Sequence, residues 1–454
     1  MSVKTKENIK MIIIVVLFLT TILLLYLIWG GSDEVKVSDL IPRFGRDADE
    51  IEVGSSVEPD KTYYSAGDGS FRCVSDSYYT FRQIMEKFRN FSDKSTVMSM
   101  EIQKEQFEEA IKNHPSVIAE FTYTFPFAEL CSDLGIGGSN AYSNIGNINS
   151  VCFSSAATDS LLVANTAEKK YYRLVSDSVD LEFEEPFSFA QDYNCYEVSR
   201  VLGVGEGGLF PLLSQTYLQE GSCSESNNIS AEEYTEIARI FFGDSFDFVR
   251  RISDSFGNHT FMYGFGQKTL TLGADGSIEY KAEAETGNSG GFYGDLKTAK
   301  SFINAVIMRH YAYPEDVNGG LKLKSVTQTG SGKSAAYTFR FVQYCECELY
   351  DPEGNGYALE ITVENGQVSR LKSKIVLMDT LPYDETLPHQ VVDAANVIAA
   401  NAPSDEAFVR IAENYRSMDE VLYISEGKLL PAWKLTLDDG SILFYDLFTG
   451  ESMK

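Results

Sequence analysis

One short segment of the chain has the composition of a nucleophile site. Residues 287–291 read Gly-Asn-Ser-Gly-Gly and place Ser289 among glycines, a pattern found around reactive serines. Such a serine needs an imidazole base within hydrogen-bond reach and a carboxylate that orients the imidazole. The nearest upstream histidine is His259, only 30 positions earlier, which leaves no room for a β-barrel between the two. The segment also runs directly into a predicted helix, so we interpret it as a loop.

Two glycine-rich segments match phosphate-binding loops in spacing alone. Gly203, Gly205 and Gly208 have the G-x-G-x-x-G spacing of dinucleotide sites, but the sequence predicts neither the following helix nor a βαβ frame. Residues 332–334, Gly-Lys-Ser, match the end of a phosphate loop, but Thr327 stands where that loop needs its first glycine. We therefore predict two loops and no nucleotide cofactor.

The residue types that bind metals lack the spacing of a metal site. The acidic residues form no calcium loop, and no H-E-x-x-H pair occurs among the four histidines, His114, His259, His310 and His389. Seven cysteines are spread thinly along the chain, so we interpret most of them as small buried apolar groups, leaving one or two bridges open. Cys345 and Cys347 are predicted to share one face of a strand. These patterns predict no catalytic, cofactor-binding or metal-binding residues, and a protein that is not an enzyme.

The element that positions everything else is Met11–Trp29. Its nineteen residues carry no charge, and a helix of that length spans about 28 Å, close to the thickness of a bilayer core. Tyr26 and Trp29 lie at its end, where aromatic rings favour the membrane interface, and Thr20 and Thr21 are its small polar candidates for contact with a partner helix. We predict an uncleaved membrane anchor; a cleaved signal peptide is the competing interpretation.

The flanks of this segment predict its orientation. The first ten residues carry a net charge of +2, and acidic residues dominate the stretch after Trp29. The positive-inside rule places the N-terminus in the cytoplasm and the bulk of the chain outside the cell, in a single-pass topology. The whole chain has a net charge of −28, which opposes binding of nucleic acid.

Composition and periodicity divide the chain into six predicted parts. They are a cytoplasmic tail (1–10), a transmembrane anchor (11–30), a spacer with one early strand (31–69), an N-terminal α+β domain (70–225), a central helix-plus-hairpin unit (226–292) and a C-terminal α+β region with two such units (293–454). In the N-terminal domain the pattern predicts helices over Asp76–Phe91 and Lys104–Lys112, a strand over Val117–Phe127 and a hairpin over residues 161–175.

Three later segments alternate apolar and polar residues about an Asp-Gly or Asn-Gly turn and predict β-hairpins. They are Leu270–Lys281, Leu359–Lys372 and Leu435–Asp446. Each follows a predicted helix: Ser230–Phe242, Asp295–His310 and His389–Asn401. We interpret the three units as a structural repeat. The predicted fold class is α+β: one N-terminal transmembrane helix, then a multi-domain exterior part of helices packed on small antiparallel β-meanders.

Several local segments resemble the YycH family. They are Ala238–Asp247, Val249, Asp275–Tyr280, Phe341–Gln343, Leu359–Leu371, Pro431–Trp433, Asp439–Gly440 and Thr449–Glu451. The last three are also similar to the related YycI proteins. The resemblance is loose and extends over residues 70–454.

The resemblance implies a regulatory role. Proteins of the YycH and YycI type are extracytoplasmic accessory regulators of the sensor histidine kinase WalK, whose two-component system controls cell-wall metabolism. It therefore implies two partners, a sensor histidine kinase in the membrane and a YycI-like accessory protein, with signal transduction through protein–protein contacts. A ten-residue tail has no room for a signalling domain, which agrees with a message passed through another membrane protein.

Two alternatives remain open at this point. An anchored cell-envelope enzyme predicts a deep pocket with clustered acids, or a histidine beside a nucleophile. An exterior ligand-binding or peptide-binding module predicts an open sheet face with a groove.

Overall fold

The computed structural model describes residues 57–74, 77–92, 97–137, 142–157, 160–176, 191–205, 208–224, 231–284, 286–308, 320–354, 356–380, 382–384 and 386–453. The predicted anchor Met11–Trp29, with Thr20, Thr21, Tyr26 and Trp29, lies outside these residues. Within the described ranges, no helix is both long and apolar enough to cross a membrane. Val53–Lys454 forms one compact unit, and all elements described below belong to it.

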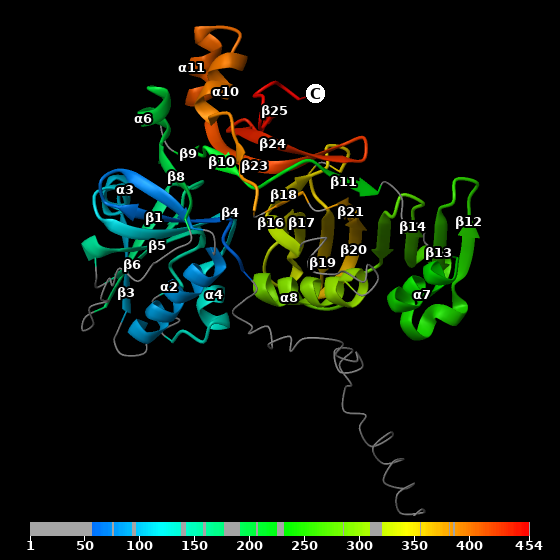
Figure 1. Ribbon diagram of the computed structural model, residues 1–454. Helices are drawn as coiled ribbons and strands as arrows, with labels where there is room; N and C mark the ends of the chain where they lie inside the picture. The colour runs from blue at the N-terminus through cyan, green and yellow to red at the C-terminus, as the bar shows by residue number, and fades with distance from the viewer. Residues whose placement is uncertain are drawn as a thin grey trace, which may run out of the picture. The chain divides into compact units, whose positions relative to one another are not determined.

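The first half of this unit is built on a nine-stranded antiparallel sheet with the order β3-β7-β6-β5-β4-β1-β2-β8-β9 (Figure 1). Its strands are β1 (Lys61–Ala66), β2 (Ser70–Val74), β3 (Val97–Ile102), β4 (Pro115–Pro126), β5 (Asn147–Ser154), β6 (Ser160–Asn165), β7 (Lys170–Ser176), β8 (Gln191–Glu197) and β9 (Leu209–Leu212). Its helices are α2 (Ser77–Ser92), α3 (Lys104–Lys112), α4 (Phe127–Asp133) and α6 (Val198–Leu202).

Helices cover both faces of this sheet because the sheet is apolar on both. The apolar stripe of α2 places Phe81, Ile84 and Phe88 against one face, where the rings of Phe81 and Phe121 lie 5.3 Å apart at 81°. On the other face, Phe107 and Ala110 of α3 pack on residues of β1, β2, β5 and β6. A strand between two apolar layers must be apolar along its length, and all six residues of β6 are buried.

The second half contains a fourteen-stranded sheet with the order β12-β13-β14-β15-β20-β19-β17-β18-β23-β24-β11-β21, to which β16 adds on β17 and β25 on β24. Its strands are β11 (Gly221–Ser224), β12 (Arg250–Ser253), β13 (His259–Tyr263), β14 (Lys268–Leu272), β15 (Ile278–Ala282), β16 (Gly320–Thr329), β17 (Ala336–Cys345), β18 (Cys347–Tyr350), β19 (Leu359–Glu364), β20 (Gln367–Ser373), β21 (Leu377–Thr380), β23 (Tyr415–Ser425), β24 (Lys428–Leu437) and β25 (Ile442–Asp446). Within this sheet the pair β18–β23 is parallel.

Four helices accompany the second sheet: α7 (Ala231–Phe242), α8 (Gly291–Ile303), α10 (Ala394–Asn401) and α11 (Asp405–Glu413). α8 packs on β17, β19 and β20, and α7 packs on β14, as Figure 1 shows along the lower side of the sheet. α10 belongs to a second core that contains the buried Trp433, whose indole nitrogen donates a 3.0 Å hydrogen bond to the carbonyl of Val392. A short pair, β10 (Gln215–Thr216) with β22 (His389–Gln390), lies beside it.

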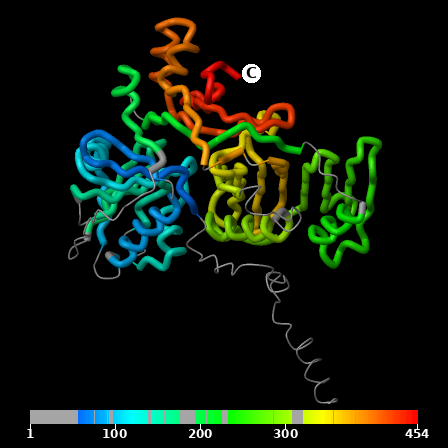
Figure 2. The backbone as a smooth tube through the Cα atoms, in the orientation of Figure 1, coloured from blue at the N-terminus to red at the C-terminus, as the bar shows by residue number. Residues whose placement is uncertain are grey.

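The segment after β9 connects the two halves. Figure 2 shows the green chain of β9–β11 passing alongside the orange and red C-terminal segment, and β11 pairs with both β24 and β21. The Tyr415 hydroxyl donates a 3.0 Å hydrogen bond to the carbonyl of Leu209, and the rings of Phe210 and Tyr415 lie 5.3 Å apart. The C-terminal residues therefore pack against both halves of the unit.

The mixed α+β class is confirmed, and so are the three predicted hairpins, which form β14–β15, β19–β20 and β24–β25. The prediction of separate small meanders is wrong: β15 pairs with β20, and all three hairpins belong to one large sheet. Residues 389–390 form β22 rather than the start of a helix. Helix α10 begins later because the Asp393 carboxylate accepts hydrogen bonds from the amides of Ala395 and Asn396 and caps it. The repeat interpretation and the domain boundaries stay predictions.

Candidate functional site

The serine among glycines has a structural role just before α8, whose N-cap residue is Gly290. The Ser289 hydroxyl donates a 2.6 Å hydrogen bond to Asp295 and accepts one from the amide of Gly291 at 3.1 Å. Asp295 also accepts from the amide of Gly290 at 2.9 Å, so both side chains bond at the first turn of α8. His259 lies on β13 instead, where its Nδ1 is 2.6 Å from the Ser253 hydroxyl. The structure does not join Ser289 and His259 in a hydrogen bond.

The other sequence motifs also have structural roles. Gly203 has a φ of 77° and ends α6, so it does not open a helix as a dinucleotide fingerprint would. Residues 332–334 form a single 3₁₀ turn before β17. Within the described ranges no group of three or more His, Cys, Asp or Glu side chains is placed to hold a metal ion. His310 lies outside those ranges.

All seven cysteines lie within the described residues, where none of them forms a disulfide, and six of them are buried. Burial raises the pKa of the Cys131, Cys152 and Cys195 thiols, so these groups stay protonated and unreactive at neutral pH. Cys345 and Cys347 do not lie in one strand as predicted, because the chain reverses at Glu346, which has a φ of 59°. The two cysteines are direct partners across the antiparallel β17–β18 pair, so they share one face of the sheet from two strands.

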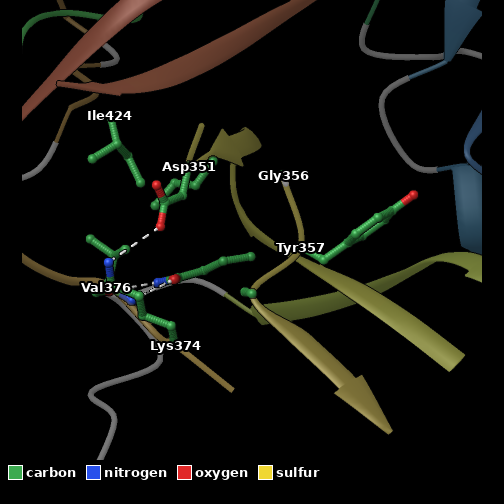
Figure 3. Close-up of a pocket in the computed structure, with 9 residues that line it drawn as sticks. Asp351, Gly356, Tyr357, Lys374, Val376 and Ile424 are labelled. Carbon is green, nitrogen blue, oxygen red and sulfur yellow. Dashed lines mark hydrogen bonds and ion pairs between the residues drawn. The ribbon is translucent and has the colours of Figure 1, made fainter. Parts of the chain in front are cut away.

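One small hollow lies beside β17, β18 and β23, lined in part by Asp351, Tyr357 and Lys374. Its volume of about 10 Å³ is room for roughly one water molecule, whereas pockets that bind metabolites measure hundreds of cubic ångströms. The ammonium of Lys374 lies 3.7 Å from Asp351, and Figure 3 shows the Tyr357 ring pointing away from Asp351 and Ile424. This hollow is too small to be a substrate site.

A larger concentration of charge lies where the first strand meets the second sheet. Six side chains form it, and we call them the charge junction: Asp60, Lys61, Lys324, Glu348, Asp419 and Lys434. Lys61 is the first residue of β1 and Asp60 directly precedes it, while the other four come from β16, β18, β23 and β24. Three cations face three anions, so the cluster is neutral as a whole.

The charge junction consists of two chains of ion pairs. In the first, the Lys324 ammonium lies 2.6 Å from Asp60 and 3.3 Å from Glu348, and Glu348 also pairs with Lys434. In the second, Lys61 pairs with Asp419, which accepts a further 2.9 Å hydrogen bond from the Ser417 hydroxyl. The side chains of Lys434 and Glu348 are only 10% and 9% exposed, and those of Lys61 and Asp419 about one fifth. Water therefore screens the pair of Glu348 and Lys434 least.

The electrostatics favour the charged form of the paired groups. Burial alone would raise the pKa of Asp60, but Lys324, Lys322 and Lys61 outweigh burial and hold that pKa below its ordinary value. Asp419 is held low by Lys61 in the same way. Burial likewise lowers the pKa of a lysine, yet Asp60 and Glu348 raise that of Lys324, and Asp419 raises that of Lys61. These groups stay ionised at neutral pH.

The charge junction links the beginning of β1 to strands β16, β18, β23 and β24 of the second sheet. Asp60 is held in register by its amide, which donates a 2.8 Å hydrogen bond to the carbonyl of Glu120, and its own carbonyl accepts from Lys322 at 3.0 Å. The ion pairs then join residues far apart in sequence, with Lys61 and Asp419 separated by 358 positions. A displacement of β1 would separate paired, partly buried charges. The arrangement can therefore transmit a displacement at residue 60 to the C-terminal strands, and it has no reacting centre.

Sequence reasoning missed the charge junction. Lys322 and Lys324 alternate with leucines in β16 and look like the solvent side of a strand. One usable signal was Lys434, a single charge between Trp433 and Leu435 in a strand whose neighbours are buried. Such a lysine requires a partner, but the sequence does not say which acid supplies it.

No protein-family model matches the chain, and no curated protein matches it. Among solved structures, the fold is similar to that of YycH from Bacillus subtilis, with a TM-score of 0.55 and 10% sequence identity over 88% of this chain and 98% of that one. An uncharacterised protein from Eubacterium rectale gives a TM-score of 0.35 with 11% identity, over 53% of this chain and 86% of that one. The fold is therefore YycH-like, as the resemblance in the sequence implied.

Proposed function

We propose that this protein is a membrane-anchored extracytoplasmic regulator that modulates a sensor histidine kinase through protein–protein contacts, as the resemblance to the YycH family implies. The observation that carries the proposal is the similarity of fold to YycH from Bacillus subtilis over 88% of the chain. The uncharged segment Met11–Trp29 supports it, because a helix there would bring the chain beside a kinase in the same membrane. In this proposal the protein has no enzymatic activity of its own.

The charge junction gives the proposal a physical route. A signal that reaches the kinase from outside must pass between the exterior part and the membrane segment. Lys61 is the first residue of β1 and Asp60 directly precedes it, and both form ion pairs with residues of the second sheet. A partner that displaces those strands would therefore pull on the segment that leads toward the membrane.

The test is reconstitution with a kinase. The full chain and a WalK-type kinase are placed together in nanodiscs, and the rate of kinase autophosphorylation is measured. We expect that rate to change by about fivefold or more when the protein is present. A variant with Met11–Trp29 replaced by an unrelated apolar helix of equal length should lose most of the effect. An unchanged kinase rate in the presence of the native chain would reject the proposal.

The predicted topology has its own test. Tyr79 is 58% exposed, so a Tyr79→Cys variant should react with a membrane-impermeant thiol reagent in intact cells. A Lys4→Cys variant should react only after the membrane is made permeable. Labelling in the opposite order would place the bulk of the chain in the cytoplasm and remove the basis of the proposal.

A further inference from the structure

The second sheet ends in a strand that is exposed on both faces. β12 is the last strand in the order, and its four residues, Arg250–Ser253, are all exposed. Within the described part of the chain, β13 is its one neighbour, and no strand pairs with its outer edge. An edge of this kind presents free backbone hydrogen-bonding groups.

The hydrogen-bond pattern identifies which groups are free. The amide of Asp254 donates a 3.1 Å hydrogen bond to the carbonyl of Asn258, so residues 254 and 258 are a hydrogen-bonded pair. In an antiparallel pair such positions alternate, so Ile252 with Thr260 and Arg250 with Met262 are hydrogen-bonded pairs as well. The N–H and C=O groups of Arg251 and Ser253 must then point outward, along the free edge.

Proteins protect such an edge with charged side chains, a short strand, a proline, a bulge or a covering element, and β12 is four residues long and carries two arginines. β12 has no proline, and its register with β13 runs without a bulge. Instead, its apolar residue Ile252 is 55% exposed. The edge is thus open to a further strand.

Three exposed aromatic side chains lie near the ends of β12 and of its neighbour β13. Phe248, two residues before β12, is 76% exposed, Phe256 in the β12–β13 turn is 82% exposed, and Phe265 in the β13–β14 turn is 104% exposed. Phe265 also has a φ of 58° and lies between two glycines of positive φ, Gly264 and Gly266. A bulky side chain in this left-handed region is strained, so the fold holds an aromatic ring in water at a conformational cost.

The charge of the edge indicates what it accepts. The protein carries a net charge of −28, yet β12 presents two consecutive arginines, Arg250 and Arg251, on opposite faces of the strand. In the described part of the chain no carboxylate lies within ion-pair distance of Arg250, and the Arg251 guanidinium contacts His259 and Thr235 instead. A second copy would bring two more arginines and an equal excess of negative charge. An acidic strand would meet complementary charge.

We propose that the outer edge of β12, together with Phe248, Phe256 and Phe265, is a docking site for an extended, acidic segment of a partner protein. The segment adds to the sheet as a further antiparallel or parallel strand. Its backbone bonds to Arg251 and Ser253, its acidic side chains face the arginines, and its apolar side chains cover the aromatic rings. The proposal does not depend on the identity of the kinase or on the predicted anchor.

The probe is a displayed library of random twelve-residue peptides, selected against the purified full chain in detergent. We expect the enriched peptides to alternate apolar and acidic residues and to slow the amide exchange of Arg251 and Ser253. Binding of a labelled enriched peptide is then compared between variants by fluorescence anisotropy. Its affinity should fall as NaCl rises from about 50 to about 500 mM.

Ser253 gives a matched pair of variants. Ser253→Pro removes an outward N–H and should weaken the enriched peptide about tenfold, whereas Ser253→Ala keeps the N–H and should change the affinity less than about twofold. Arg250→Glu and Phe265→Asn should each weaken it about tenfold, and they test the site independently if Ser253→Pro fails to fold. Met100→Ser removes a 47% exposed apolar side chain from β3 at the edge of the other sheet, and it should leave the affinity unchanged.

Three results would overturn the proposal. The selection could enrich no peptide or only basic ones, or the enriched peptides could bind all the β12 variants as tightly as the native chain. Sedimentation velocity could also show that the chain dimerises and that Ser253→Pro abolishes the dimer, in which case a second copy occupies the edge.

Discussion

Two regions of the second sheet treat charge and backbone in opposite ways. At the charge junction, six ionised side chains are drawn out of water and paired across strands that are distant in sequence. At β12, two arginines and three aromatic rings remain in water beside a free strand edge. The same fold thus pairs its buried charges at the charge junction and leaves the outer edge of β12 without a neighbouring strand.

The difference indicates different tasks. A neutral, partly buried ion-pair network costs desolvation energy and becomes favourable only when every partner is present, so it fixes one arrangement of β1 against the C-terminal strands. An open edge with exposed aromatic rings invites association and is normally removed by selection unless something binds there. We therefore infer that the charge junction holds β1 against the C-terminal strands and that β12 binds a partner. Four predictions test these two roles.

The largest expected effect is the loss of stability caused by a substitution of Glu348. Glu348→Gln leaves the ammonium of Lys434, only 10% exposed, without a counter-charge and removes a second partner from Lys324. We expect the free energy of unfolding to fall by about 3–5 kcal/mol, because a buried charge is left unpaired. Urea denaturation followed by circular dichroism measures the change.

A surface pair provides the control for Glu348. Glu360→Gln breaks a 2.7 Å bond from Arg340 between side chains that are 29% and 26% exposed, and it should cost less than about 1 kcal/mol. Replacing both Glu348 and Lys434 with methionine should restore most of the stability, because no charge is then left alone. Equal losses in Glu348→Gln and Glu360→Gln would show that the charge junction is an ordinary surface network.

The next effect is a pH dependence. The pKa values of Asp60 and Asp419 are lower in the folded protein than in the unfolded chain. The unfolded state therefore binds more protons in acid, and the stability contributed above about pH 4 is lost as the pH falls through the folded values. Between pH 6 and pH 3, the native chain should lose more stability than Asp419→Asn, by up to about 1.3 kcal/mol, which is the limit for one carboxyl with an unfolded pKa of about 3.9. If the free energy of unfolding fell equally with pH in the native chain and in Asp419→Asn, the lowered pKa of Asp419 would be contradicted.

A smaller effect separates neighbouring residues of β12. Ile252→Pro removes an N–H that bonds to β13 and should cost about 1–2 kcal/mol, whereas Ser253→Pro removes an outward N–H and should cost less than about 1 kcal/mol. Thermal unfolding of both variants measures the difference. If Ser253→Pro proved the more damaging substitution, the alternation of hydrogen bonds along β12 would be the reverse of the one inferred here.

The smallest effect is a gain in stability. Phe265 has a φ of 58°, a conformation that asparagine adopts more readily than phenylalanine. Phe265→Asn should therefore raise the free energy of unfolding by up to about 1 kcal/mol while it weakens the peptide enriched on β12. Phe248→Asn, at a residue outside the left-handed region, should bring no such gain. A loss of stability in Phe265→Asn would mean that the ring packs within the fold.

Much of the local structure was predictable from the sequence. The spacing of Phe81, Ile84 and Phe88 predicted α2, and the alternation around Gly276, Gly366 and Gly440 predicted three hairpins that the structure contains. The break at Glu346 and the cap at Asp393 were missed, because a single turn or capping residue interrupts a pattern without changing its average period. No sequence motif predicted the candidate sites. Lysine and glutamate residues that alternate with apolar residues along a strand have the pattern of a solvent-facing side.

The sequence by itself determined the α+β class, the main helices and hairpins, and the YycH-like fold that its resemblance implied, because periodicity and turn residues act over a few positions. Only the tertiary structure decided that β15 pairs with β20, that Lys61 meets Asp419 and that β12 is left without an outer neighbour. The physical reason is that a strand's period specifies which face is apolar but not which strand lies beside it. That choice depends on packing between residues that are hundreds of positions apart.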